Sequence, residues 1–308
     1  MIARALILAA VMAASVGAAP AAEQQSRPPI TGVSHLAVYT ADPAASEDFY
    51  RRVLGAKKVA DPEDAGGVRY MFSDRQFVEV LPLPAGQGPS RLAHVAYTTT
   101  DAAALRRYLL GHGTKGVTAL ATGATGERWF ATRDPEGNEV RFVQPLGRTA
   151  QVTPTAISGR IIHVGYAVRN RAAEDRFYRD LLGFRPYWYG AMKEGATDWI
   201  SQQVPDGRDW IEYMMIGAGS TVDEKRVDAR QLGVLNHLSL GVPDMAVAVA
   251  KLTAENRLSP RHDGPQMGRD GKWQANLYDP DGTRVELMEF QPVAKPCCSA
   301  FTADSPTR

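Results

Sequence analysis

The feature that most constrains the fold of this chain is an internal repeat. A short β-prone segment with a histidine in it occurs four times along the sequence, at His35, His94, His163 and His237. In the first and third copies, the phrase Phe-Tyr-Arg begins fourteen residues after the histidine and a Leu-Gly pair follows it. Helical spacing before that glycine predicts a helix of about three turns. The fold must therefore accommodate repeated strand-helix units.

The second and fourth copies share a later phrase, Asp-Pro-x-Gly, at 134–137 and 279–282. Proline and glycine at these places predict a tight hairpin turn, and an alternating strand follows each turn. Helical patterns cover 101–111 and 245–256 in the same two copies. We therefore expect four units of strand, helix and about three strands, beginning near residues 32, 91, 160 and 234.

Length and composition fit two domains of ordinary size. The 308 residues are about twice the roughly 150-residue prior for one domain. The Pro/Thr/Ser-rich stretch at 148–159 is the expected linker between an N-terminal module, 32–147, and a C-terminal module, 160–291. The net charge of +1 provides no field that would gather phosphates, so nucleic acid is excluded as an expected partner.

Both ends of the chain carry signals of their own. Arg4, an acid-free apolar run and the small residues Ala19 and Ala21 are typical of a signal peptide, here 1–21. We expect a secreted or periplasmic protein that leaves the membrane after cleavage.

The C-terminal end, 292–308, is predicted to be a flexible tail. It contains the adjacent residues Cys297 and Cys298, for which three interpretations remain: two free thiols, a site for a soft metal, or an intermolecular disulfide bridge.

The joint spacing of histidine strand, F-Y-x-x-x-L-G helix and D-P-x-G hairpin resembles the vicinal oxygen chelate superfamily. That superfamily includes glyoxalase I, the extradiol ring-cleaving dioxygenases and the bleomycin resistance proteins. The resemblance covers nearly all of 32–291 and implies an α+β fold, in which four βαβββ units form two glyoxalase-like cups. In such cups a metal binds to side chains from the first and last strands of each unit.

In the C-terminal module, the resemblance places a ligand at each of these four strands. Two imidazoles and two carboxylates suit one divalent metal, which could be Zn, Ni, Mn or Fe(II). Either glutamate could act as the catalytic base. The expected ligands are His163, Glu212, His237 and Glu286.

The N-terminal module keeps three of these positions, with His35, Glu79 and His94. Arg141 occupies the fourth, seven residues after the turn aspartate, and a guanidinium there would repel a divalent cation. Glu139, two residues earlier, could replace it. We expect a weaker second site, or a degenerate module without metal.

Aromatic residues gather in the C-terminal half and could line an apolar substrate pocket. The expected pocket residues are Trp188, Trp210, Trp273 and Tyr278.

Three functions follow from the resemblance, each with a small molecule as partner. The first is a glyoxalase-type lyase or isomerase that acts on a metal-bound vicinal-oxygen substrate, with Glu286 or Glu212 moving a proton. The second is an extradiol-type Fe(II) dioxygenase. Asp270 and Asn276 depart from that pattern, because such enzymes commonly have histidine and tyrosine there. The third is a non-catalytic binding protein of the bleomycin-resistance type. Association of two chains through the edges of their cups is left open.

Overall fold

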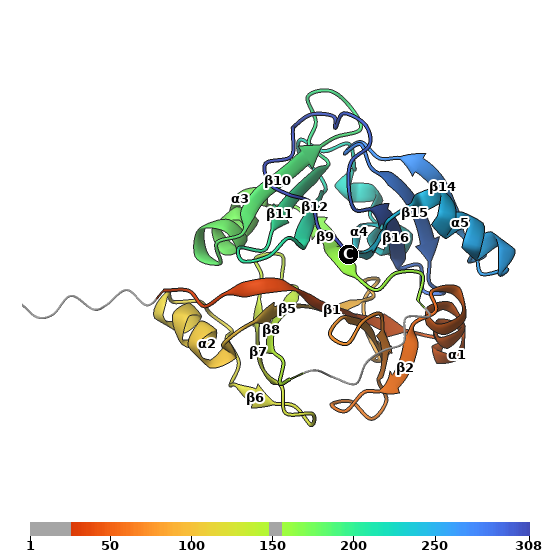
Figure 1. Ribbon diagram of the computed structural model, residues 1–308. Helices are drawn as coiled ribbons and strands as arrows, with labels where there is room; N and C mark the ends of the chain where they lie inside the picture. Colours follow the sequence, from red (N-terminus) through yellow and green to blue (C-terminus); the bar gives the residue numbers. More distant parts are fainter. Residues whose placement is uncertain (1–25, 148–155) are drawn as a thin grey trace, which may run out of the picture.

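The computed structural model describes residues 26–147 and 156–308. The predicted signal peptide, 1–21, and most of the predicted linker lie outside the described residues. Two eight-stranded sheets, each built from two βαβββ units, form the molecule. Figure 1 shows the first module, coloured red to yellow, stacked against the second, coloured green to blue. The predicted α+β fold of four units in two cups is confirmed.

The first module orders its strands as β2-β3-β4-β1-β5-β8-β7-β6. The first strands of its two units, β1 and β5, pair antiparallel at the centre, and each pairs in parallel with the last strand of its own unit. The elements are β1 (Ile30–Thr40), α1 (Pro43–Glu47), a π-helical segment (Asp48–Val53), β2 (Lys57–Ala60), β3 (Val68–Met71), β4 (Phe77–Pro82), β5 (Leu92–Thr99), α2 (Ala102–Gly111), β6 (Ala121–Thr122), β7 (Arg128–Arg133) and β8 (Glu139–Gln144).

The second module repeats this order as β10-β11-β12-β9-β13-β16-β15-β14. It adds a 3-10 turn and the helix α4 before its second unit, which the sequence pattern did not predict. The elements are β9 (Ile161–Val168), α3 (Arg171–Asp175), a π-helical segment (Arg176–Leu181), β10 (Arg185–Gly190), β11 (Trp199–Gln203), β12 (Trp210–Met215), a 3-10 turn (Glu224–Arg226), α4 (Ala229–Leu235), β13 (His237–Val242), α5 (Met245–Ala254), β14 (His262–Met267), β15 (Trp273–Tyr278) and β16 (Arg284–Glu289).

The helices of the first and third units are short α-helices that continue as π-helical turns. The Asp42 side chain accepts hydrogen bonds from the first backbone N–H groups of α1, and Asn170 caps α3 in the same way. Gly55 and Gly183 then adopt φ angles of 75° and 77°, a left-handed conformation that glycine adopts without steric cost. The predicted three-turn helices are therefore present, with a mixed geometry. Tyr50 lies in the first π-helical segment and is fully buried.

The Asp-Pro-x-Gly turns join the two modules. The Tyr50 hydroxyl donates to Asp279 Oδ2 at 3.1 Å, and the Tyr178 hydroxyl lies 3.5 Å from Asp134 Oδ2. Each turn of one module therefore binds the Phe-Tyr-Arg segment of the other. A second acidic residue strengthens each contact, because Asp281 accepts from the backbone after β1 and Glu136 accepts from the backbone after β9. One hydrophobic core accordingly contains residues of both modules.

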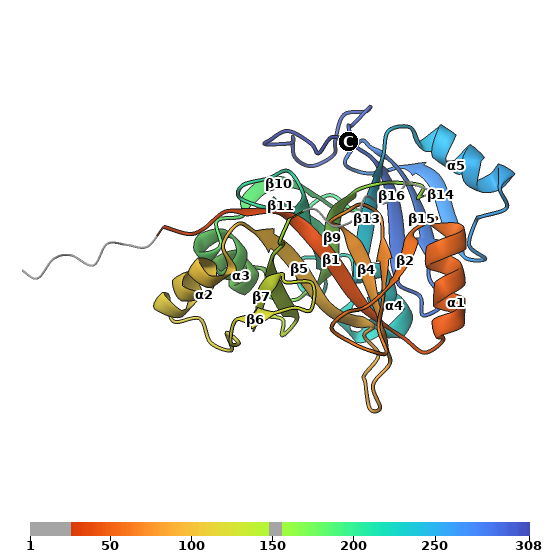
Figure 2. The same cartoon turned by 60° about the horizontal axis from the view of Figure 1, so that its bottom comes forward.

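The predicted flexible tail, 292–308, is packed against the second module, so that prediction is wrong. Thr302 N donates to Tyr187 O at 3.0 Å, and the Ser305 hydroxyl lies 2.6 Å from that of Tyr187. The physical reason is that β10 is an edge strand, whose open backbone groups accept the tail as a partner. Cys297 and Cys298 form a disulfide with each other. Figure 2 shows this last segment, in dark blue, on the outside of the second module.

The opposite edge of this sheet is β14, whose residues are all exposed and which contains Pro265. Among the helices of the described residues, none is long and apolar enough to cross a membrane.

We predict that Tyr50→Phe lowers the free energy of unfolding by about 1–3 kcal/mol, because it leaves the buried Asp279 carboxyl without one of its donors. Urea unfolding followed by circular dichroism measures the change. The double variant Tyr50→Phe/Asp279→Asn should lose less than the sum of the single losses, since the two groups interact directly.

Tyr189→Phe is the matched control, because this tyrosine is 48% exposed and its hydroxyl lies outside the interface between the modules. We expect a change within about 0.5 kcal/mol for it. Equal stability of Tyr50→Phe and the control would mean that the hydrogen bond does not hold the modules together.

Candidate metal centre

The four predicted ligands of the second cup come from the four central strands, β12, β9, β13 and β16. Gly165 on β9 pairs with both His237 and Glu212 on the neighbouring strands. A Cβ atom at Gly165 would lie 2.2 Å from Cε1 of His237. The imidazole of His237 therefore occupies the space that a side chain at position 165 of β9 would fill. This packing allows it to lie next to His163.

Three ligand atoms converge at this point. His163 Nε2 lies 3.0 Å from His237 Nε2 and 3.3 Å from Glu286 Oε2. Glu286 Oε2 is buried and has no hydrogen-bond partner among the described residues. Two imidazole nitrogens and a carboxylate oxygen in such a group are a donor set that divalent transition metals prefer. The residues therefore fit a divalent metal ion.

The surroundings keep both imidazoles in the form that binds metal. His237 Nδ1 donates to the backbone oxygen of Leu235 at 2.9 Å, which leaves the Nε2 lone pair directed into the cup. Burial lowers the pKa of His163 and of His237, so both rings are neutral. Burial would raise the pKa of Glu286, but the close His163 imidazole and the charge of Arg284 outweigh it and leave that pKa lowered.

Glu212 differs from Glu286 in place and in charge state. Its Oε2 lies 3.6 Å from His237 Nε2, outside the group of three converging atoms, and its Oε1 is 3.4 Å from the Ser201 hydroxyl. Burial and the nearby charge of Glu286 raise the pKa of Glu212 to about 8. The two carboxyl groups of this cup are thus in different environments, and their pKa values are shifted in opposite directions.

The first cup brings together three of the residues assigned to it. His35 Nε2 lies 2.9 Å from His94 Nε2, which lies 3.3 Å from Glu79 Oε2. The fourth, Glu139, does not join them, because its carboxylate accepts a hydrogen bond from Arg141 Nε at 2.7 Å. Glu139 pairs with His94 across the sheet, and Arg141 lies two residues further along the same strand, on the same face. The carboxylate of Glu139 therefore bonds to this guanidinium instead of joining the cluster.

The two cups differ in the order of charges on one strand. Arg141 on β8 pairs with the residue two after His94, and Glu286 on β16 pairs with the residue two after His237. When the two cups are aligned by their strand pairing, Glu139 corresponds to Arg284, and Arg141 corresponds to Glu286. The first cup also holds Arg69, whose Nε is 3.9 Å from Glu79 Oε1. Burial, Arg69 and Arg141 together lower the pKa of His35.

A cavity of about 250 Å³ opens beside the ligands of the second cup. Two of the expected aromatic residues, Trp188 and Trp210, line it. Trp273 does not, because side chains alternate along β15 and the pocket side is taken by its neighbours; it is 38% exposed. Tyr278 lies at the far end of β15, where its hydroxyl donates to Asp263. The other aromatic and sulfur-containing wall residues are Tyr187, Met192, Trp199, Met267, Met288 and Phe301.

Several site residues escaped the sequence analysis. Ser201 pairs with Glu212 across β11 and β12, a relation that only the register reveals. Phe301 reaches the pocket from the tail, and a single aromatic residue in a polar segment was its only signal. Lys272 is fully buried behind the wall, with its ammonium 4.8 Å from the ring centre of Trp210.

Comparison with known families agrees with this architecture. Residues 32–142 and, separately, residues 162–275 match families described as the Glyoxalase/Bleomycin resistance protein/Dioxygenase superfamily. The chain belongs to this superfamily, and it carries two such modules.

Individual relatives are distant. A curated protein named "Probable lactoylglutathione lyase, chloroplastic", from Arabidopsis thaliana, is 27% identical over 145 residues, which are 46% of this chain and 39% of that protein. Among solved structures, the 2,3-dioxygenase LapB from Pseudomonas sp. KL28 has a TM-score of 0.62 at 16% identity and covers 88% of this chain and 99% of its own. Homoprotocatechuate 2,3-dioxygenase from Brevibacterium fuscum has a TM-score of 0.62 at 18% identity, over 91% of this chain and 75% of its own. These similarities show the fold.

We predict one equivalent of divalent metal per chain, bound in the second cup. The double variant His163→Ala/His237→Ala should lose it, and His35→Ala/His94→Ala should keep it, because the guanidinium groups near His35 oppose a cation in the first cup. Elemental analysis of protein purified without chelator measures the content. Metal lost from the first-cup variant alone would reverse the assignment of the two cups.

Proposed function

We propose that the second cup is the active site of a metal-dependent enzyme, a glyoxalase-type lyase or isomerase that acts on a small vicinal-oxygen substrate. The observation that carries this proposal is the division of the two carboxyl groups. Glu286 lies in the compact group with His163 and His237, whereas Glu212 stands beside that group with a raised pKa. This division supports a role for Glu286 as a metal ligand and a role for Glu212 as a proton carrier.

Each residue then has a separate task. A divalent metal held by His163, His237 and Glu286 would supply Lewis-acid chemistry to two neighbouring oxygens of the substrate. Glu212 takes a proton at Oε2 from the carbon that bears one of the two oxygens and returns it to the neighbouring carbon that bears the other, so that the carbonyl and hydroxyl groups exchange places. The Ser201 hydroxyl orients Glu212 through Oε1. The aromatic wall excludes water from the proton during the transfer.

The dimensions of the pocket support a small substrate. Its volume of about 250 Å³ is slightly below the roughly 300–1,000 Å³ typical of ligand pockets. Arg269 and Arg284 also line it and offer positive charge to an anionic group. The substrate we propose is therefore compact and carries two adjacent oxygens.

A second candidate is an extradiol-type dioxygenase with Fe(II). The observation that favours it is the donor set itself, since two histidines and one carboxylate with open positions are typical of non-heme iron oxygenases. Asp270 and Asn276 line the same pocket at places where this class commonly has histidine and tyrosine. For that reason we rank it second.

The substitution Glu212→Gln tests the leading proposal. It should leave the metal content unchanged and lower kcat by about 10²- to 10⁴-fold, the usual contribution of a positioned acid or base. Glu286→Gln should instead lower the metal content. The assay measures isomerisation of thiol adducts of 2-oxoaldehydes by the Zn²⁺-, Ni²⁺- and Mn²⁺-loaded protein.

Full activity of Glu212→Gln would rule out this role for the glutamate. Oxygen uptake with catechol by the Fe(II)-loaded protein, together with no isomerase activity under any metal, would place the dioxygenase first. A metal-free protein that is inactive in both assays and binds an aromatic ligand would instead be a binding protein of the bleomycin-resistance type.

We also propose that the chain is exported, on the strength of the predicted signal peptide at 1–21. The Cys297–Cys298 disulfide supports this, because such bonds persist in oxidising compartments.

A further inference from the structure

The C-terminal segment 292–308, which we call the strap, connects two separate parts of the rim of the second cup. At one end, Val293 N donates to Gly271 O at 2.8 Å and Cys297 N donates to Arg269 O at 2.7 Å. These acceptors lie in the loop between β14 and β15. At the other end, Ser299 and Thr302 bond to the backbone of β10. The strap therefore spans the two opposite ends of the sheet order.

The contact between the strap and the β14–β15 loop requires a glycine at position 271. Its φ of 80° is in the left-handed region, and a Cβ atom there would lie 2.2 Å from the backbone oxygen of Ala294. A side chain at position 271 would therefore push the strap away from the loop. The close approach marks the strap as an integral part of the cup.

Phe301 is the part of the strap that enters the pocket. Its ring centre lies 4.8 Å from that of Tyr187, and the ammonium of Lys272 lies 5.1 Å from it. Because Lys272 is fully buried and also faces Trp210, the cation holds the rings of the strap and of the sheet together. Phe301 is thereby fixed as one wall of the cavity that contains Glu212 and Glu286.

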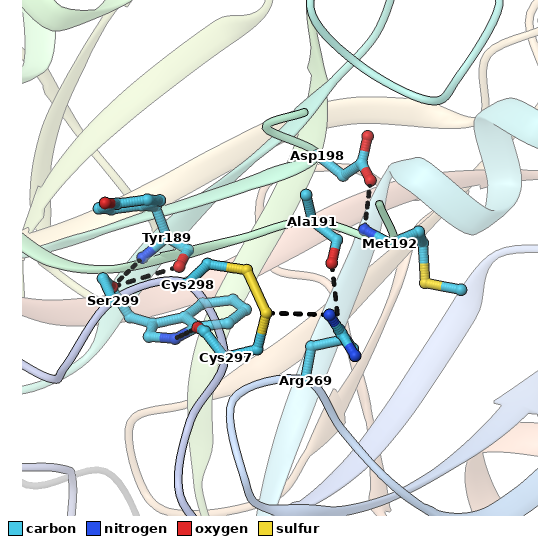
Figure 3. Close-up of a disulfide and its surroundings, with 9 residues drawn as sticks. Tyr189, Ala191, Met192, Asp198, Arg269, Cys297, Cys298 and Ser299 are labelled. Atoms are coloured by element: carbon cyan, nitrogen blue, oxygen red, sulfur yellow. Dashed lines mark hydrogen bonds between the residues drawn. A yellow bond between two sulfur atoms is a disulfide. The ribbon is translucent and has the colours of Figure 1, made fainter. Parts of the chain in front are cut away.

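The disulfide lies where the strap turns from the loop toward β10. Cys298 has a φ of 73°, in the left-handed region that glycine favours and other residues seldom adopt. Cys297 is held on both sides, since its backbone oxygen accepts from Trp188 Nε1 at 3.2 Å and its sulfur lies 3.0 Å from Arg269 Nη2. Figure 3 shows these contacts, with Ser299 against Tyr189 on the far side of the bond. The covalent link between adjacent residues keeps this turn.

We infer that the strap is a wall of the substrate pocket, in which Phe301 limits the size of the ligand and the Cys297–Cys298 disulfide stabilises the turn that directs the strap from the β14–β15 loop to β10. The limit on ligand size rests on the proposed function of the second cup. The enclosure of the pocket by the strap rests on the contacts alone.

The first experiment tests the enclosure by acrylamide quenching of tryptophan fluorescence, since Trp188, Trp199 and Trp210 line the pocket. Phe301→Ala should raise the quenching constant severalfold without changing the metal content. Val293→Ala is the matched control, because it lies in the strap with 63% exposure and should leave quenching unchanged. Equal quenching of wild type and Phe301→Ala would overturn the proposal.

The second experiment tests the size limit with two probes that present vicinal oxygens, catechol and 4-tert-butylcatechol. Calorimetric titration of the Zn²⁺-loaded protein should show that Phe301→Ala strengthens binding of the bulky probe relative to catechol severalfold. Phe301→Leu, which keeps an apolar side chain, should shift the ratio less. An unchanged ratio would remove Phe301 as the size-limiting residue. Binding of neither probe to wild type would count against the proposed function alone, and the quenching result would still decide on the strap.

The third experiment tests the role of the Cys297–Cys298 disulfide and leaves Phe301 unchanged. Dithiothreitol reduces the bond, so that each cysteine gains one electron and one proton while the reagent becomes a cyclic disulfide. Reduced wild type and Cys297→Ser/Cys298→Ser should both show quenching raised toward that of Phe301→Ala. Quenching unchanged in both would mean that the disulfide does not hold the strap. If Phe301→Ala does not fold, Phe301→Leu takes its place in the quenching measurements.

Discussion

The docking of each Asp-Pro-x-Gly turn against the opposite module is the interaction on which the rest of the structure depends. Tyr50 and Tyr178 lie in the core, where water cannot replace a lost partner, and each finds its partner on the turn of the other module. The strand that follows each turn carries the deciding residue of its cup, seven positions after the turn aspartate. Fixing the turn therefore fixes the register of β8 and β16, and with it the positions of Arg141 and Glu286.

One charge reversal distinguishes two cups that share a backbone. Both contain a pair of buried histidines whose Nε2 atoms lie about 3 Å apart, so geometry alone would treat them alike. Each pair has a carboxylate beside it, Glu79 in the first cup and Glu286 in the second, but in the first cup Arg69 and Arg141 line the same cavity. Electrostatic attraction between Glu286 and a cation acts at short range in a buried site, where it is least screened. The same strand position therefore carries opposite charges in the two cups, Arg141 in the first and Glu286 in the second.

The sequence predicted what depends on local spacing and on the repeat. The four units, the helices after each histidine and the strand positions of His163, His237 and Glu286 follow from periodicity and from the turn motif. Contacts between distant segments were not predictable in this way. The path of the tail depends on the open edge of β10 and on Lys272, and the exposure of Trp273 depends on which face of β15 the sheet buries. Glu139 looked equivalent in sequence to a ligand, but its nearest partner is Arg141.

The edges of the second sheet are protected by two different devices. β14 contains Pro265, which has no N–H group to donate, and on β10 the strap forms hydrogen bonds with the backbone. Neither edge offers a continuous row of hydrogen-bonding groups to a strand of another molecule. The strap thus covers an edge strand as well as lining the pocket. Without it, the backbone of β10 would be open to pairing with a strand of another molecule. Protection of the β10 edge and closure of the pocket therefore depend on the same seventeen residues at 292–308.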